Sequence, residues 1–329
     1  MNSSADLDVR ATAARDWALQ QLDLADAAFA PASADASFRR YFRIENGARS
    51  WVVMDAPPER EDCRPFLKVA QLLLDAGLNA PRVIAQDLAR GFLLLGDLGR
   101  QTYLHAITAD NADALMLDAI DALIRWQLAS RPGMLPAYDA ALLQRELALF
   151  PDWYVGRHLG TALNDAQAER LAAIDALLIE SALAQPRVYV HRDYMPRNLM
   201  ISSPNPGILD FQDAVEGPIA YDVVSLFKDA FLSWPAERVE RWRRLYGEHA
   251  RRAGLPVADD AEFARQFDWM GVQRHLKVIG IFARINYRDG KPHYLADVPR
   301  FITYVREVAL RYRELAPLLR LFDELGMVA

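Results

Sequence analysis

The sequence predicts an α+β protein in which a small, strand-rich lobe precedes a larger helical lobe. In the first hundred residues, short apolar runs alternate with turn-forming residues, which is typical of strands. Farther along, apolar residues recur mostly at helical spacing, and one polar, strand-containing segment interrupts them near residue 200. A chain of 329 residues is long enough for both lobes. We expect the boundary at Asp97-Leu98-Gly99, with lobes at residues 1–97 and 98–329.

Each element of the first lobe follows from a local pattern. Pro31 interrupts the chain after the first helix, and Asn46-Gly47 is typical of a tight turn between two hairpin strands. Pro65 in a first turn and Gly77 just past a last turn indicate the ends of a second helix. The elements expected are a helix over residues 6–26, strands over 38–44 and 50–55, a helix over 64–76 and a buried strand over 91–96.

The second lobe is predicted to be mainly helical. Three short apolar runs near its middle predict strands, and the turn-forming segment 202–207 should join the last two as a hairpin. The strands are expected over residues 188–190, 199–201 and 208–211, and the helices over 110–129, 139–150, 165–184, 221–232, 235–253, 259–285 and 298–325.

Composition excludes several classes of protein. The formal net charge of −6 argues against a nucleic-acid or anionic-membrane binder. The single cysteine, Cys63, excludes an intramolecular disulfide and a multi-cysteine zinc site, and it fits a reducing compartment. The N-terminus lacks the apolar core of a signal peptide, and no window is apolar enough for a membrane span, so we expect a cytoplasmic protein.

The segment 188–213 concentrates polar residues that carry chemistry. Asp193 and Asn198 lie five residues apart on one loop, and Asp210 ends the apolar run of the next strand. A hairpin would fold Asn198 and Asp210 toward each other. Carboxylate and amide oxygens suit Mg²⁺, which takes its remaining ligands from water and phosphates. This segment therefore predicts a magnesium and phosphate site.

The spacing His-x-Asp-x-x-x-x-Asn, followed by Asp-Phe in an apolar setting, resembles the catalytic and metal loops of protein-kinase-like enzymes. The version here is similar to the aminoglycoside-phosphotransferase branch, which implies a two-lobed protein-kinase-like fold and the use of ATP and Mg²⁺. The resemblance implies that Asp193 accepts or orients the proton of the attacking hydroxyl, and that Asn198 and Asp210 hold Mg²⁺. It also implies that His191 and Asp222 support the loop.

The strand lysine usual in this family is missing. Only four of the 38 basic residues are lysines, and residues 50–55 contain no basic residue at all. The following helix, 64–76, lacks the glutamate that would pair with such a lysine. The preceding strand carries Arg39, Arg40 and Arg43. We therefore expect Ser37 and an arginine of this strand, with Arg40 and Arg43 as the chosen candidates, to contact the nucleotide phosphates, because arginine binds phosphate in a bidentate manner. Solvated strand arginines remain an alternative.

Charge in the second lobe indicates the acceptor. Residues 263–300 contain seven basic and three acidic residues, which favours an anionic acceptor over a polycation, although a solvated basic face is an alternative. Residues 35–43 and 273–284 resemble those of kinases that phosphorylate the anomeric hydroxyl of N-acetylmuramate and N-acetylglucosamine in bacterial cell-wall recycling. This resemblance implies a small sugar acceptor, whose carboxylate would pair with Arg274 or Lys277 and whose ring would stack on Trp153 or Tyr154.

Two alternatives remain open. The first is a kinase-like phosphotransferase for another small alcohol, such as choline, homoserine or an aminoglycoside. The second is a nucleotide-binding regulator without catalysis, which the missing strand lysine favours and the presence of Asp193, Asn198 and Asp210 opposes. The chain has no Gly-x-x-x-x-Gly-Lys-Ser/Thr motif, so a P-loop protein is excluded. The oligomeric state is not predicted.

Overall fold

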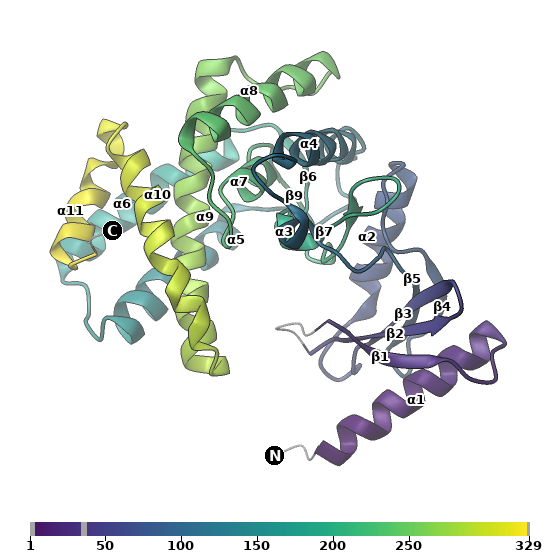
Figure 1. Cartoon of the computed structure of the whole chain (residues 1–329). Coiled ribbons are helices and arrows are strands. Elements are labelled where there is room, and N and C mark those ends of the chain that lie inside the picture. The colour runs from purple at the N-terminus through teal and green to yellow at the C-terminus, as the bar shows by residue number, and fades with distance from the viewer. Residues whose placement is uncertain (1–3, 34–37, 328–329) are drawn as a thin grey trace. The chain divides into compact units, whose positions relative to one another are not determined.

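The computed structural model describes residues 4–33 and 38–327 (Figure 1). Of the predicted site residues, Ser37 lies outside the described residues. No helix in these two ranges combines the length and the apolar character that crossing a membrane would require.

The chain divides into two compact units. Unit 1 comprises Met1–Ala119 and Arg197–Asp213, and unit 2 comprises Ile120–Pro196 and Ala214–Ala329. Unit 1 contains an antiparallel sheet and unit 2 is mainly helical, so the predicted α+β class is confirmed. The hairpin segment is grouped with the N-terminal residues, so the units do not coincide with the continuous lobes expected from the sequence. The lobe boundary after residue 97 stays a prediction.

The described part of unit 1 is built on a five-stranded sheet with the order β1-β2-β3-β5-β4. Every neighbouring pair is antiparallel, and β2 and β3 pair from Arg40 with Asp55 to Asn46 with Arg49. Gly47 at the turn has a φ of 62°, a conformation that the Asn-Gly pattern predicts. The strands are β1 (Ala28–Ser33), β2 (Arg40–Asn46), β3 (Arg49–Asp55), β4 (Val83–Asp87) and β5 (Phe92–Gly96).

The two edge strands, β1 and β4, were not predicted. Pro31 lies inside β1, where the sequence indicated an interruption. Proline lacks an N–H, but an edge strand leaves one row of backbone groups without a neighbouring strand, so proline is tolerated there. The pairing with β2 shifts register between Pro31 and Ser33. At the other edge, exposed residues alternate with half-buried ones along β4, and Ile84 is exposed. The segment therefore lacks the continuous apolar run that predicts β5.

Two helices accompany the sheet in unit 1. Helix α1 (Ser4–Leu22) buries Trp17 and Ala18 in a cluster with the sheet residues Ile44 and Phe92, as its position along the sheet in Figure 1 indicates. It ends earlier than residue 26, the end expected from the sequence. Helix α2 (Cys63–Asp75) begins after Asp62, whose side chain accepts a hydrogen bond from the Arg64 N–H as an N-cap.

The remaining elements of unit 1 are short. Strands β7 (Leu199–Met200) and β8 (Gly207–Ile208) form the predicted hairpin, and α3 (Tyr103–Ala106) lies beside β7 through the bridge between Thr102 and Met200. Helix η2 (Pro196–Asn198) precedes β7, and α4 (Ala112–Leu128) runs from unit 1 into unit 2.

Unit 2 surrounds a long helix, α9 (Asp260–Asp289), whose residues from Gln266 to Gly280 are all buried. A two-stranded sheet of β6 (Arg187–Val190) and β9 (Val215–Pro218) carries the catalytic-loop segment. The other elements are α5 (Ala140–Leu147), η1 (Phe150–His158), α6 (Asp165–Leu183), α7 (Tyr221–Phe227), α8 (Ala236–Arg252), η3 (Pro292–Asp297), α10 (Val298–Ala309), η4 (Arg313–Leu315) and α11 (Ala316–Glu324). The helix predicted over 298–325 is thus two helices.

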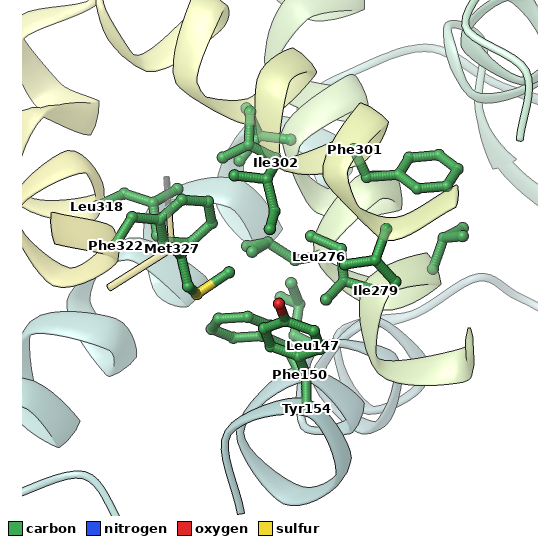
Figure 2. Close-up of a cluster of buried hydrophobic side chains, with 14 of the residues drawn as sticks. Leu147, Phe150, Tyr154, Leu276, Ile279, Phe301, Ile302, Leu318, Phe322 and Met327 are labelled. Atoms are coloured by element: carbon green, nitrogen blue, oxygen red, sulfur yellow. The ribbon is translucent and has the colours of Figure 1, made fainter. Parts of the chain in front are cut away.

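The core of unit 2 lies where α9 crosses the helices on either side of it. Figure 2 shows Leu276 and Ile279 of α9 among side chains from η1, α10 and α11. The approach is close at Gly280, where a Cβ atom would lie 2.3 Å from the carbonyl carbon and oxygen of Leu149. A side chain at this position would collide with the backbone between α5 and η1, so glycine allows α9 to approach that closely.

Candidate active site

The predicted site residues fall into two groups, one in each unit. In unit 1, the hairpin brings Asn198 and Asp210 together, as the sequence predicts. The Leu209 N–H donates to the Asn198 carbonyl at 2.9 Å, and the Asn198 side-chain amide donates to Asp210 Oδ2 at 3.5 Å. Asp210 has a φ of 62°, in the left-handed region that few residues other than glycine adopt. A residue held in that conformation is typical of functional sites.

Further contacts fix the Asp210 carboxylate. The Gln212 side-chain amide donates to Asp210 Oδ1 at 3.0 Å, and Arg39 Nη2 lies 3.7 Å from the same oxygen. The Phe211 ring, next in the chain, packs on Phe66 of α2 at a centroid distance of 4.8 Å. Arg39, which lies just before β2, therefore contacts the predicted metal ligand.

Arg40 and Arg43, the two arginines chosen from the sequence as phosphate ligands, have acidic partners in unit 1. Arg40 forms an ion pair with Asp55, a fully buried carboxylate at the end of β3 that also pairs with Arg10. Arg43 Nε lies 2.6 Å from Asp97 Oδ2, and its Nη2 donates to the Gly99 carbonyl at 2.6 Å. Burial acts to raise the pKa of Asp97, but the hydrogen bond from Arg43 and other donors hold it below its usual value. The phosphate-binding role of Arg40 and Arg43 stays a prediction.

In unit 2, the catalytic loop is held through its backbone by Asp222. Asp222 Oδ2 accepts the His191 N–H at 2.6 Å, and Oδ1 accepts the Arg192 N–H at 3.0 Å. Asp222 is completely buried, and this burial raises its pKa to about 7 against the opposing effect of the two N–H donors. The carboxylate lies in the first turn of α7, so α7 and the loop form one hydrogen-bonded group.

His191 shapes the same turn. Its side chain is buried, its Nδ1 accepts the Asp193 N–H at 3.3 Å, and its ring meets Tyr194 edge-on at 5.7 Å. Arg192 between them has a φ of 74°, again in the left-handed region. These contacts place His191 in the packing of the loop, and its role as a supporting residue stays a prediction.

Next to this loop lies a buried cluster of charged side chains that the sequence did not reveal. Glu146 of α5 forms ion pairs with Lys277 at 2.8 Å and with Arg192 at 2.5 Å. Its second oxygen, Oε2, accepts hydrogen bonds from the Tyr138 hydroxyl and, at 3.3 Å, from the Gln273 amide. Burial acts to raise the pKa of Glu146, but Lys277 and Arg192 lower it to about 2. Glu146 is therefore ionised at neutral pH.

The four predicted acceptor residues lie in different surroundings. Lys277 belongs to the Glu146 cluster, whereas Arg274 is 2% exposed and interacts electrostatically with the buried Asp229, whose pKa burial raises to about 6. Tyr154 lies inside the hydrophobic core of unit 2, stacked on Phe150 (Figure 2). Trp153 is partly buried against the same core. The structure thus places Lys277 beside the catalytic loop and Tyr154 among core side chains.

The fold and the site define a class of protein. A small antiparallel sheet, a larger helical unit and a supported His-x-Asp loop followed by an Asn–Asp pair are the features of a kinase-like phosphotransferase. A crystal structure of an ADP-bound aminoglycoside phosphotransferase has the same fold, with a TM-score of 0.61 at 14% sequence identity over 89% of this chain and 97% of that one.

Sequence comparison identifies the family. Residues 28–260 match the model of the phosphotransferase enzyme family, and the chain belongs to that family. It is 61% identical to proteins from Pseudomonas putida and Pseudomonas aeruginosa, both named N-acetylmuramate/N-acetylglucosamine kinase. The matches cover 89% and 88% of this chain and 87% and 86% of those proteins. The chain is therefore an ATP-dependent phosphotransferase, as the motif resemblance implied.

Proposed function

We propose that this enzyme transfers the γ-phosphate of ATP to the anomeric hydroxyl of N-acetylmuramate or N-acetylglucosamine, and that it serves peptidoglycan recycling in the cytoplasm. The observation that carries the proposal is the 61% identity to two kinases named for these sugars, over nearly nine-tenths of the chain. Basic residues outnumber acidic ones between residues 263 and 300, but Lys277, Arg288 and Arg300 form ion pairs within the chain, so this excess alone does not identify the acceptor.

In the proposed reaction, Asp193 orients the anomeric hydroxyl and accepts its proton as the bond to phosphorus forms. An anomeric hydroxyl is more acidic than an ordinary alcohol, so positioning contributes more than basicity. The support of the loop by Asp222 serves this positioning because it fixes the backbone on the N-terminal side of Asp193.

Asn198 and Asp210 fit a magnesium site. Their side-chain oxygens suit a hard cation, and two ligands from the chain leave the other positions to water and phosphate oxygens. Mg²⁺ bound there would neutralise charge on the nucleotide phosphates. Arg39 holds Asp210 from the side of the sheet, which supports it as a further cation near the phosphates.

The acceptor contacts remain proposals. The lactyl carboxylate of N-acetylmuramate needs a cation, for which Arg274 and Lys277 are the candidates. Trp153 is the stronger candidate for stacking on a sugar ring, because Tyr154 packs within the hydrophobic core. The contacts of Lys277 with Glu146 and Tyr221 favour a different role.

Product analysis tests the proposed function. The purified chain is incubated with Mg-ATP and either N-acetylmuramate or N-acetylglucosamine, and the product is examined by ³¹P and ¹H NMR. Phosphate on carbon 1 is expected. Phosphate on carbon 3 or 6 contradicts the proposed acceptor group. Turnover of choline, homoserine or an aminoglycoside in place of both sugars supports another small alcohol, and nucleotide binding without any turnover supports a regulator.

A further inference from the structure

We propose that Glu146 and Lys277 are positioning residues for phosphoryl transfer, which hold the catalytic loop through the side chain of Arg192. They act on N-acetylmuramate and N-acetylglucosamine alike, and Lys277 does not bind the carboxylate of the acceptor. This inference rests on the proposed function only for the identity of the sugars.

The Glu146 carboxylate has a complete set of donors. Oε1 receives Arg192 and Lys277, and Oε2 receives Tyr138 and Gln273. A carboxylate offers about four acceptor positions, so this set saturates it. The side chain is 5% exposed, and its rotamer is therefore determined by protein contacts rather than by water. The Glu146 carboxylate therefore has a fixed position, and Arg192 binds to it there.

The Glu146 cluster also connects three helices at the catalytic loop. Gln273 and Lys277 are four residues apart on α9 and so lie on the same face of the helix. Lys277 also donates a hydrogen bond to the Tyr221 hydroxyl at 2.9 Å, and Tyr221 immediately precedes Asp222. The cluster thus joins α5, α7 and α9 at the catalytic loop. Asp222 holds the loop by its backbone, and Glu146 holds it by the side chain of Arg192.

The backbone of Arg192 is strained. A φ of 74° lies in the left-handed region, which is unfavourable for a residue with a Cβ atom. Such a conformation persists where surrounding contacts hold it, and the Glu146 ion pair with Arg192, together with the Asp222 hydrogen bond, supplies them. Asp193 follows directly in the chain, so a change in the backbone of Arg192 moves the catalytic carboxylate.

The charges of the buried cluster balance one another. Glu146 carries one negative charge against the two positive charges of Lys277 and Arg192, and both cations interact electrostatically with Asp193. The four groups together are neutral when both carboxylates are ionised. Removing one member of such a buried group leaves an uncompensated charge, which is destabilising. Lys277 is 7% exposed and committed to Glu146 and Tyr221, so its charge is already compensated within the protein.

Three variants of the full chain separate these effects. Glu146→Asp keeps the charge but withdraws the carboxylate by one methylene group. Lys277→Met removes one cation, and Glu146→Gln combined with Lys277→Met removes a balanced pair. Asp175→Asn is the matched control, because Asp175 is a buried carboxylate in α6 of the same unit, and the donor to it is Gln144, at 3.5 Å. The values of kcat and KM are measured for ATP and for each sugar, and Tm is measured for each variant.

We expect Glu146→Asp to lower kcat by about 10²-fold with both sugars, since a misplacement of about 1 Å costs that much. The KM for ATP should change by less than about threefold. The Tm of the double variant should be closer to the wild-type Tm than the Tm of Lys277→Met is. The kcat of the double variant should nevertheless stay low, a combination that a role in stability alone would not produce. Asp175→Asn should retain the wild-type kcat.

Two results would overturn the inference. A wild-type kcat in Glu146→Asp and in the double variant would show that the cluster does not position the loop. A rise in KM for N-acetylmuramate alone in Lys277→Met would show that Lys277 binds the lactyl carboxylate. Failure of the proposed function is seen separately, because the wild-type chain would then phosphorylate neither sugar.

Discussion

Asp175 offers a quantitative test of how burial controls ionisation in this enzyme. Its carboxylate lies in α6, is 6% exposed, and accepts one long hydrogen bond, from Gln144 at 3.5 Å. Burial raises the pKa of Asp175 from 3.8 to about 6. A carboxyl group whose pKa is raised on folding binds its proton more tightly in the folded state. The free energy of unfolding therefore falls as the pH rises from about 4 through 6.

The magnitude follows from the two pKa values. One pKa unit corresponds to about 1.4 kcal/mol, so the raised pKa lowers the free energy of unfolding by about 1 kcal/mol at pH 4.5 and about 3 kcal/mol at pH 8. Asp175→Asn cannot ionise and has no such dependence. Relative to the wild type, the free energy of unfolding of the variant should increase by about 2 kcal/mol between these two pH values. This corresponds to roughly 4–8 °C in Tm for a unit of this size.

Thermal melts of the wild type and the variant at pH 4.5, 6 and 8 measure this gain. Glu169→Gln, an exposed residue of the same helix, controls for the loss of one charge. The change of its Tm difference with pH measures the general effect of losing one charge and is subtracted from that of Asp175→Asn. A constant Tm difference for Asp175→Asn would refute the reasoning, because it would mean that the buried carboxyl group ionises at the same pH in the folded and unfolded chain.

Three further predictions concern the site and the helix that supports it. Asp193→Asn should lower kcat by about 10²–10⁴-fold while the chain stays folded, and near-normal turnover would exclude its proposed role. Arg39→Ala should raise the KM for ATP more than Arg40→Ala, because Arg39 contacts Asp210 whereas Arg40 pairs with Asp55; equal values would contradict this assignment. Gly280→Ala should destabilise the fold by about 1–3 kcal/mol, since its Cβ would meet the Leu149 backbone, and an unchanged urea midpoint would count against that contact.

The sequence predicts the elements whose signals are local. The Asn-Gly turn and the buried strand at residues 91–96 give patterns that need no knowledge of neighbours, and both are found in the structure. The edge strand β1 was missed because its proline is compatible with a strand only at an edge, and a sequence does not reveal which strand is the edge. The predicted helix over 298–325 is interrupted near Leu310, which is 75% exposed, so the apolar pattern there did not indicate burial.

The same distinction applies to the candidate site. The motif residues lie within one segment of the chain, so their spacing could be recognised directly. Glu146 could not be found in this way, because its partners come from residues 138, 192, 273 and 277, which only the folded chain brings together. In the sequence it is one acidic residue of an ordinary amphipathic helix.

The location of the basic residues changes the interpretation of the missing strand lysine. β3 carries a buried acid, Asp55, which is held by Arg10 of α1 and Arg40 of β2. The sheet therefore contains a buried ion pair network, but the residue on β3 is an acid instead of the usual lysine. The cations that pair with it come from α1 and β2. Because Arg40 pairs directly across the strands with Asp55, it is committed to the sheet. Arg39 lies just before β2, and its Nη2 lies 3.7 Å from Asp210 Oδ1, so we propose Arg39 as the cation that replaces the strand lysine.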